Sequence, residues 1–365
     1  MTDAFFSSLN IKAGVTAKNR LAVAPMTRVT AAEDGAATER MTRYYERFAK
    51  GGFGLIVTEG LYTDQAHAQG YVFQPGMADE AQANSWKAAV RAMQSHGALA
   101  VAQIQHAGGI SQGNRFRKAT LAPSAVKPKG QQMKFYYGEG DYALPTAMSD
   151  EQIADAIAGF AAAAKRAVEV AGFDGVEIHG ANGYLIDQFL TDYTNQRADR
   201  WGGATANRVQ IAVEVVKSVR EQVGAPVGVR ISQGKVNDYT HKWAGGEADA
   251  EVIFGSLADA GVDYIHVTEF EAWKPAFGDA GPSLAQLAKA FAPGVTVIAN
   301  GNLHDPVSAQ ELLRNGADIV ALGRGALANP DFPRRVAASE PLRTFDPAIL
   351  GPIANIKDAE LAGAH

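Results

Sequence analysis

The sequence contains no cysteine in 365 residues. This absence excludes disulfides, thiolate zinc sites, iron–sulfur clusters and a cysteine nucleophile, and it fits a reducing compartment. Long apolar runs are also lacking, because no stretch approaches the roughly 18 apolar residues of a membrane helix. The opening residues 1–6 do not read as a signal peptide. We therefore expect a cytoplasmic protein without a membrane partner.

An excess of basic residues is lacking too. Lys and Arg together number 34 against 39 Asp and Glu, which gives a net charge of -5. Such a chain has no surplus of cations to follow a phosphate backbone, so nucleic acid is not an expected partner. The sequence has neither a G-x-x-x-x-G-K-[ST] loop nor a G-x-G-x-x-G turn after a strand. A tightly held nucleotide would therefore need another kind of site. We also expect no metal site.

The sequence does contain short apolar runs that alternate with longer helical patterns, which is typical of strand–helix units around a parallel sheet. One such helix is predicted over 150–171, with a capping box formed by Ser149 and Gln152. Eight units in a chain of this length predict a single α/β domain over 1–365, a (β/α)8 TIM barrel. The eight predicted strands are 21–25, 54–58, 98–104, 175–179, 226–231, 264–267, 296–299 and 319–322.

The segment 105–147 is rich in Gly, Pro, Lys and Tyr and is too long for an ordinary connection. It follows the third predicted strand, on the side where barrel enzymes keep their active sites. We interpret it as a lid or small excursion over the site, with a disordered surface loop as the alternative. The tail 343–365 shows no clear periodicity, and the sequence assigns it no role.

The last two predicted strands end in glycine-containing loops, Asn300-Gly301-Asn302 and Gly323-Arg324-Gly325. Glycine lets backbone amides approach a ligand closely, loops after barrel strands seven and eight often bind phosphate, and an arginine adds a charged fork. Either loop alone could be only a tight turn. Together they favour a phosphate site, which would suit a nucleotide cofactor or a phosphorylated substrate.

Polar side chains crowd the end of the fourth predicted strand, where His179, Asn182 and Tyr184 fall within six residues. If the chain turns helically there, His179 and Asn182 share one face and can both donate to a single oxygen. Tyr184 would then lie above them with a transferable phenolic proton. A lone histidine at a strand end is more often structural, but the three side chains together predict a substrate site.

These features resemble the Old Yellow Enzyme family of FMN-containing ene-reductases, and the similarity runs from about Leu21 to Asp331. One such motif would be weak, whereas the whole set agrees in order and spacing. The matching motifs are Ala24-Pro25-Met26-Thr27-Arg28, Thr58-Glu59-Gly60, Gln103, the segment from His179 to Leu190, Asn195-Gln196-Arg197 with Trp201-Gly202-Gly203, Val229-Arg230-Ile231, and the two glycine loops.

The resemblance implies a tightly and non-covalently bound FMN. Thr27 would hydrogen-bond the flavin C4 carbonyl, and the Gly60 amide would lie nearby. Gln103 and Arg230 would bind the pyrimidine edge, where the arginine favours the anionic reduced flavin. The other residues expected at the cofactor are Pro25, Met26, His179, Gly301, Asn302, Gly323 and Arg324.

The resemblance also implies two half-reactions at one site. NADPH or NADH would pass hydride to the flavin and leave, and an α,β-unsaturated carbonyl or nitro compound would then bind. His179 and Asn182 would polarise its oxygen, flavin N5 would return hydride to the β-carbon, and Tyr184 would protonate the α-carbon as the general acid.

Some positions depart from the pattern of the family. Gln105 stands where many relatives carry an aromatic residue or alanine, and we expect it to line the substrate pocket. No aromatic residue is evident around Leu350-Gly351, where some relatives place one over the substrate. Trp273 and Phe277, after the sixth predicted strand, are candidates for the pocket, with surface or core packing as the other interpretation.

Two other functions stay open on the sequence alone. A non-catalytic barrel that senses flavin would bind FMN without turnover, although flavin binding does not need His179, Asn182 and Tyr184. A cofactor-free barrel enzyme acting on a phosphorylated substrate would be colourless. The sequence does not choose between NADH and NADPH, or between a monomer and a homodimer.

Overall fold

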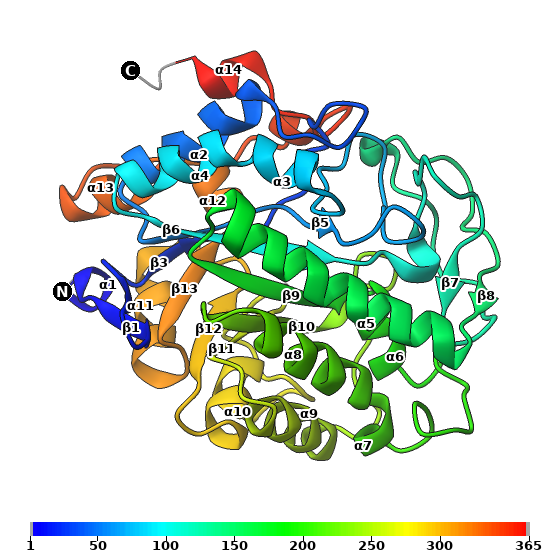
Figure 1. The fold of residues 1–365 in the computed structure, drawn as a ribbon. Coiled ribbons are helices and arrows are strands. Elements are labelled where there is room, and N and C mark those ends of the chain that lie inside the picture. The colour runs from blue at the N-terminus through cyan, green and yellow to red at the C-terminus, as the bar shows by residue number, and fades with distance from the viewer. Residues whose placement is uncertain (1–2, 363–365) are drawn as a thin grey trace.

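A closed barrel of parallel strands forms the centre of the computed structural model, which describes residues 3–362 (Figure 1). Each strand pairs with the next in sequence order, and the last pairs with the first to close the ring. The predicted barrel and the positions of its eight strands are confirmed. The barrel strands are β3 (Leu21–Val23), β4 (Leu55–Val57), β6 (Leu99–Gln105), β9 (Gly175–Asn182), β10 (Val227–Lys235), β11 (Tyr264–Thr268), β12 (Thr296–Asn300) and β13 (Ile319–Leu322).

Helices follow the strands and cover the outside of the barrel (Figure 1). The helix predicted over 150–171 forms as an α-helix that ends in a π-helical turn, Arg166–Ala171, and the capping box between Ser149 and Gln152 is present. The helices are α1 (Asp3–Phe6), α2 (Glu39–Lys50), α3 (Glu80–Ser85), α4 (Lys87–Ser95), α5 (Asp150–Lys165), α6 (Leu185–Leu190), α7 (Thr205–Arg208), α8 (Gln210–Gln222), α9 (Glu247–Asp259), α10 (Leu284–Phe291), α11 (Pro306–Asn315), α12 (Arg324–Ala328), α13 (Phe332–Ala337) and α14 (Asp358–Leu361).

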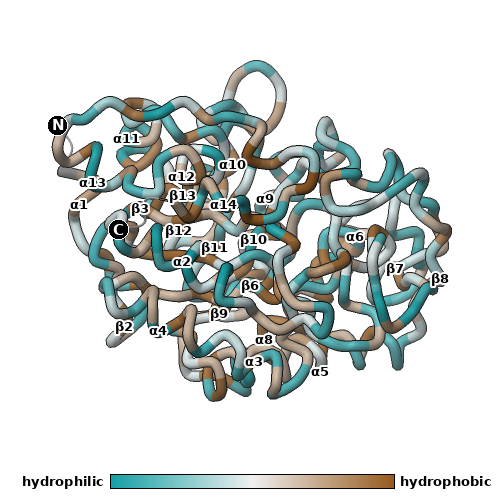
Figure 2. Tube along the Cα trace, turned by 90° about the horizontal axis from the view of Figure 1, so that it is seen from above, coloured by the Kyte–Doolittle hydropathy of each residue, from teal (hydrophilic) through white to brown (hydrophobic). Residues whose placement is uncertain are grey.

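The barrel strands are buried on both faces, which explains their continuous apolar sequences. On β4, Ile56 packs outward in the core shared with the helices, whereas Leu55 and Val57 join Tyr264 and Ile298 in a separate core inside the barrel. This alternation follows from the two-residue period of a strand. Seen from above, the strands lie in the middle of the molecule with helices around them (Figure 2). Since side chains fill the barrel, a ligand site belongs at one of its ends.

A hairpin closes the amino-terminal end of the barrel. Its strands, β1 (Leu9–Lys12) and β2 (Val15–Ala17), are antiparallel, and Ile11 contributes to the interior core. Lys12 Nζ donates to the carbonyl of Ala225, just before β10, over 3.2 Å. The carboxyl-terminal end of the barrel is the end at which barrel enzymes bind their ligands.

The segment 105–147 leaves the barrel after β6 and contains little regular structure. Its short strands β7 (Leu121–Ala122) and β8 (Thr146–Ala147) pair with each other and lie at one side of the molecule in both views (Figures 1 and 2). Two of its residues, Met133 and Tyr142, pack in a cluster with Tyr184. The segment therefore lies against the carboxyl-terminal end of β9.

The tail that begins at residue 343 returns along α2, and α14 lies beside that helix (Figure 1). The Glu360 carboxylate accepts hydrogen bonds from Arg28 over 2.8 and 2.5 Å and from Arg47 over 3.1 Å. All three side chains are buried. The tail thus holds the loop that follows β3, while residues 363–365 lie outside the described residues.

Within residues 3–362, none of the helices is both long enough and apolar enough to span a bilayer. The same residues contain no group of three or more His, Asp or Glu side chains placed to hold a metal ion. Met1 and Thr2, at the start of the opening segment considered above, are not described by the structure.

Candidate active site

Three charged or titratable side chains lie in one row across neighbouring strands. In the barrel ladder, His179 of β9 is the Cα partner of Arg230 of β10, which is in turn the partner of His266 of β11. Paired residues of parallel strands point to the same face of the sheet. All three are buried, so the sequence brings a cationic group and two imidazoles together at the end of the barrel.

Arg230 is 5% exposed and only partly satisfied by hydrogen bonds. Its Nη2 donates to Thr268 Oγ1 over 3.1 Å and to Asn300 Oδ1 over 2.9 Å, whereas its buried Nε has no partner among the described residues. Burial lowers the pKa of Arg230 to about 10, so the guanidinium stays charged at neutral pH. A buried cation with an unused donor fits the anionic edge of a ligand.

Gln103 lies beside a carboxylate that the sequence analysis missed. Its Nε2 donates to Glu177 Oε1 over 2.8 Å, and Glu177 Oε2 lies 2.9 Å from His266 Nδ1. Burial alone would raise the pKa of Glu177, but His266 and Arg230 hold it below its usual value, so the group is an anion. With its amide nitrogen engaged, Gln103 has its oxygen left for a ligand N–H. Glu177 has no signal in the sequence beyond being a charged residue within an apolar strand.

His179 is neutral and its tautomer is fixed by a backbone contact. Burial, with Arg230 and His266 nearby, holds the pKa of His179 well below its usual range. Its Nδ1 accepts a hydrogen bond from the Ala181 amide over 3.3 Å. The ring proton must then be on Nε2, which makes His179 a donor through that atom.

The helical turn expected after His179 is wrong. Strand β9 continues to Asn182, and α6 begins only at Leu185. Asn182 leaves the strand in a left-handed conformation, with φ 61°, and Gly183 follows with φ 86°. The sequence spacing therefore does not explain how Asn182 is placed, and the joint donation of His179 and Asn182 to one oxygen stays a prediction.

Tyr184 lies next to His179 and to a second tyrosine that the sequence analysis missed. The rings of His179 and Tyr184 are 4.7 Å apart, and the hydroxyls of Tyr71 and Tyr184 are 2.5 Å apart. Burial raises the pKa of Tyr184 and of Tyr71, so both phenols are protonated at neutral pH. Tyr136, from segment 105–147, packs against Tyr71 with the ring centroids 4.8 Å apart and the rings tilted by 53°. Both Tyr71 and Tyr136 lie in irregular loops, where no periodic pattern marks them.

The two glycine loops meet at an open cavity of about 210 Å³. A Cβ on Gly301, whose φ is 146°, would lie 2.2 Å from the carbonyl oxygen of Glu269, so only glycine fits there. Gly323 is the cap residue from which α12 begins, and Arg324 lines the cavity. The cavity is lined by Glu269, Phe270, Asn300, Gly301, Asn302, Leu303, His304, Leu322, Gly323, Arg324 and Gly325. Backbone amides at glycine and a flanking arginine suit a phosphate.

The loop after β3 reaches the same end of the barrel. Pro25 and Thr27 are partly exposed there, and the Met26 sulfur would lie 3.7 Å from a Cβ on Gly323. Burial is the main cause that raises the pKa of Tyr136, and a side-chain hydrogen bond with Thr27 opposes this rise. These contacts bring the first and last barrel strands to a common ligand space.

The remaining predicted pocket residues differ in where they lie. Gln105 is buried against Gly60, where a Cβ would come within 2.0 Å of its Oε1, and its Nε2 has no partner among the described residues. Trp273 is 39% exposed in the loop after β11. Its neighbour Ala272 donates a backbone hydrogen bond to the carbonyl of Gly301, in the first of the two glycine loops. Phe277 packs on Trp243 at 6.5 Å, a core contact. The role of Trp273 as a pocket residue therefore stays a prediction.

Comparison with known proteins finds relatives among flavin oxidoreductases. Residues 4–343 match the model of the NADH:flavin oxidoreductase / NADH oxidase family. A probable NADH-dependent flavin oxidoreductase of Bacillus subtilis, YqiG, is 31% identical over 91% of this chain and 87% of its own length. A probable flavin mononucleotide-dependent alkene reductase of Leishmania infantum is 33% identical over 90% and 89%. The solved structure of an old yellow enzyme homologue from Zymomonas mobilis superposes with a TM-score of 0.88 at 29% identity and covers 99% of both chains.

Proposed function

The chain belongs to the NADH:flavin oxidoreductase / NADH oxidase family, which includes the Old Yellow Enzyme homologues, and we propose that it reduces electron-poor carbon–carbon double bonds. It is an FMN-dependent oxidoreductase whose electrons come from a reduced nicotinamide. The proposed substrates are α,β-unsaturated carbonyl and nitro compounds. One observation carries this proposal: a neutral His179 with its Nε2 proton available lies against the protonated phenol of Tyr184.

The residues at the barrel end fit FMN. The unused Nε of buried Arg230 offers a cation to the pyrimidine edge, and Gln103 can accept from a ring N–H. We propose the same site for the other predicted residues, with Pro25, Met26, Thr27 and Gly60 at the ring and Gly301, Asn302, Gly323 and Arg324 at the phosphate. When bound, FMN would supply the hydride chemistry that links the reduced nicotinamide to the substrate.

The chain itself positions the substrate and supplies the proton. We propose that His179 Nε2 and the Asn182 amide donate to the carbonyl or nitro oxygen, where negative charge grows in the transition state. As hydride adds to the β-carbon, the O–H bond of Tyr184 breaks and its proton goes to the α-carbon. Tyr71, in contact with the Tyr184 hydroxyl, can stabilise the phenolate that remains.

We also propose that residues 105–147 act as a lid on this site within one FMN-binding domain. Met133, Tyr136 and Tyr142 of that segment pack around Tyr71 and Tyr184. An apolar cover of this kind excludes water and strengthens polar contacts beneath it. The pocket beyond Tyr184, including Gln105, would then select among substrates.

The absorption spectrum of the purified protein tests the proposal. We expect a flavin spectrum that NADH or NADPH bleaches without oxygen and that 2-cyclohexenone or a nitroalkene restores. A colourless protein that binds no added FMN would overturn the proposal in favour of a cofactor-free enzyme. A flavin that bleaches but is not restored by any activated alkene would instead indicate a flavin sensor.

A further inference from the structure

The turn that joins the proposed substrate anchor to the proposed acid is unusual. Asn182 and Gly183 are consecutive left-handed residues, with φ 61° and 86°. A residue with a side chain rarely adopts this conformation, because Cβ approaches the following carbonyl oxygen. The direction of the Asn182 side-chain amide and the position of Tyr184 both depend on this turn. Contacts that fix the conformation of the turn therefore also fix the proposed substrate anchor.

Two side chains hold the amides of this turn. The Asn182 N–H donates to Ser232 Oγ over 2.8 Å, and the Gly183 N–H donates to Asp187 Oδ2 over 2.6 Å. Ser232 belongs to β10, whereas Asp187 lies in the first turn of α6. Neither hydrogen bond belongs to the regular β9–β10 ladder, so both are specific to this turn.

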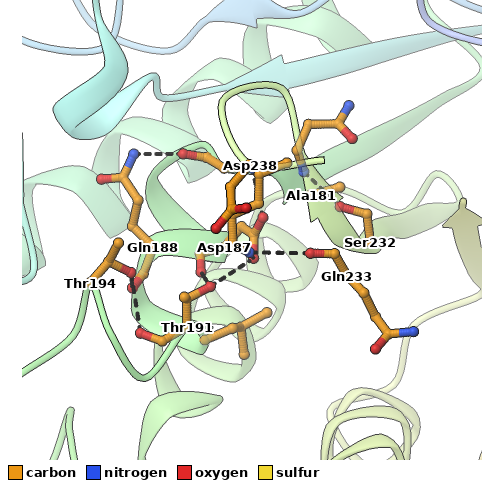
Figure 3. Close-up of polar contacts among 12 residues, drawn as sticks. Ala181, Asp187, Gln188, Thr191, Thr194, Ser232, Gln233 and Asp238 are labelled. Carbon is orange, nitrogen blue, oxygen red and sulfur yellow. Dashed lines mark hydrogen bonds and ion pairs between the residues drawn. The ribbon is translucent and has the colours of Figure 1, made fainter. Parts of the chain in front are cut away.

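The acceptor Asp187 is held in turn by a buried cation. Lys235 Nζ donates to Asp187 Oδ1 over 2.7 Å, and the two side chains are 2% and 0% exposed. Thr191 Oγ1 donates chiefly to the Asp187 carbonyl over 2.7 Å and lies 3.3 Å from the same Oδ1. Lys235 Nζ also reaches the Gln233 carbonyl over 3.4 Å. Figure 3 shows Asp187 with Thr191 on one side and Gln233 on the other.

An irregularity in β10 brings Lys235 to this position. The ladder pairs Ile231 with Gly180 and then Lys235 with Asn182, so four residues on β10 span two on β9. Ser232 lies in this irregular part of β10, and its Oγ accepts the hydrogen bond from the Asn182 backbone N–H. One bulge therefore supplies both contacts, and bulges re-aim side chains next to active sites.

We propose that the buried Asp187–Lys235 ion pair is a positioning device for the substrate anchor, which fixes the Asn182–Gly183 turn and thereby the donor of Asn182 and the phenol of Tyr184. Buried ion pairs are often no more stabilising than apolar replacements, so a role in stability alone does not account for this pair. Neither residue contacts the substrate in this proposal. The inference rests on the proposed function, because it assumes that His179, Asn182 and Tyr184 bind and reduce the substrate.

The test compares three variants with the wild type, each loaded with FMN. Lys235→Met removes the cation, and Asp187→Asn with Lys235→Met removes both charges while keeping an oxygen for the Gly183 amide. The control Lys289→Met breaks an ion pair of 2.6 Å with Asp318 at the opposite end of the barrel. The dissociation constant of 4-hydroxybenzaldehyde is measured from its charge-transfer band, and reoxidation by 2-cyclohexenone is measured after dithionite reduction.

We expect Lys235→Met and the double variant to weaken phenol binding and slow reoxidation by about tenfold each, with FMN content, dithionite reduction and the control unchanged. The double variant leaves no unpaired buried charge, so its melting temperature should stay near that of the wild type while its phenol affinity stays low. A stable double variant with wild-type phenol affinity and reoxidation would overturn the proposal. A wild type that holds FMN but binds no phenol would instead overturn the proposed function, and this proposal with it.

Discussion

The hydroxyls of Tyr71 and Tyr184 lie 2.5 Å apart and form a buried pair of phenols. Each phenol is protonated at neutral pH, because burial raises both pKa values. One of them donates to the other, and a donor beside Tyr184 would stabilise its phenolate after the proton transfer that we propose. The loop after β5 (Leu61–Tyr62) therefore contributes a group to the chemistry that we assign to β9 and its turn.

Tyr71→Phe should slow the oxidative half-reaction about tenfold at pH 7, because the Tyr184 phenolate would lose its donor. Reduction of the flavin by the nicotinamide should change little, since no proton passes through Tyr184 in that step. Stopped-flow absorbance of each half-reaction separates the two rates. Unchanged reoxidation by 2-cyclohexenone would show that Tyr71 only packs against Tyr184.

Tyr184→Phe should have a larger effect on the same step, a loss of about a hundredfold or more, because the general acid itself is removed. Flavin reduction should again be nearly intact. Rapid mixing of reduced enzyme with 2-cyclohexenone measures this directly. Equal losses in the two half-reactions would be inconsistent with an acid that acts only on the substrate.

Replacing His179 and Asn182 together by alanine should raise the dissociation constant for a phenolic ligand by about a hundredfold, as expected for the loss of two hydrogen bonds. A phenolate oxygen imitates the polarised carbonyl oxygen, so the charge-transfer titration reports on the anchor alone. If phenol affinity survives the double change, the anchoring role of the pair is wrong.

Gly301→Ala should weaken FMN binding, because the new Cβ would lie 2.2 Å from the Glu269 carbonyl oxygen and would displace the loop. We expect FMN to appear in the filtrate after ultrafiltration at concentrations where the wild type retains it. Gly294→Ala is the matched control, since its φ is also positive, at 82°, but nothing lies within 4 Å of its Cβ. Equal retention by both variants would exclude the loop from phosphate binding.

Glu360→Gln should lower the free energy of unfolding by about 3–5 kcal/mol at pH 7, because it leaves buried Arg28 without its only anionic partner among the described residues. Burial alone would raise the pKa of Glu360, but Arg28 holds it below the ordinary value. A pKa that is lower in the folded protein gives stability at neutral pH that disappears as the pH falls through the folded pKa. Urea unfolding should therefore show the two proteins converging below about pH 4.

The barrel could be predicted from the sequence because its strands are short apolar runs separated by helical patterns. The two glycine loops were expected to lie together because Gly301 and Gly323 mark close backbone approach, and both loops line one cavity. His179 and Tyr184 were predicted to lie together because polar residues at strand ends are uncommon, and their rings are 4.7 Å apart. The conformation of Asn182 was mispredicted, because a left-handed residue at the end of a strand has no periodic signature.

Other residues were missed for a related reason. Glu177 lies inside β9, and only the ladder shows that Gln103 is its Cα partner and that His266 binds its carboxylate. Tyr71 and Tyr136 come from irregular loops, and their contact joins segments that are far apart in the sequence. Such pairs depend on the closed barrel and on segment 105–147, which a single sequence does not arrange in space.

The irregularity of β10 divides that strand into two parts that contact different groups. Up to Ile231 the strand follows the regular ladder with β9 and carries Arg230, for which we propose a place at the cofactor. Between Ile231 and Lys235 the regular pairing with β9 is interrupted, and Ser232 and Lys235 support the turn of β9. Changes at residues 232–235 should therefore weaken substrate binding while FMN content is preserved, so within this one strand the two ligands depend on different residues.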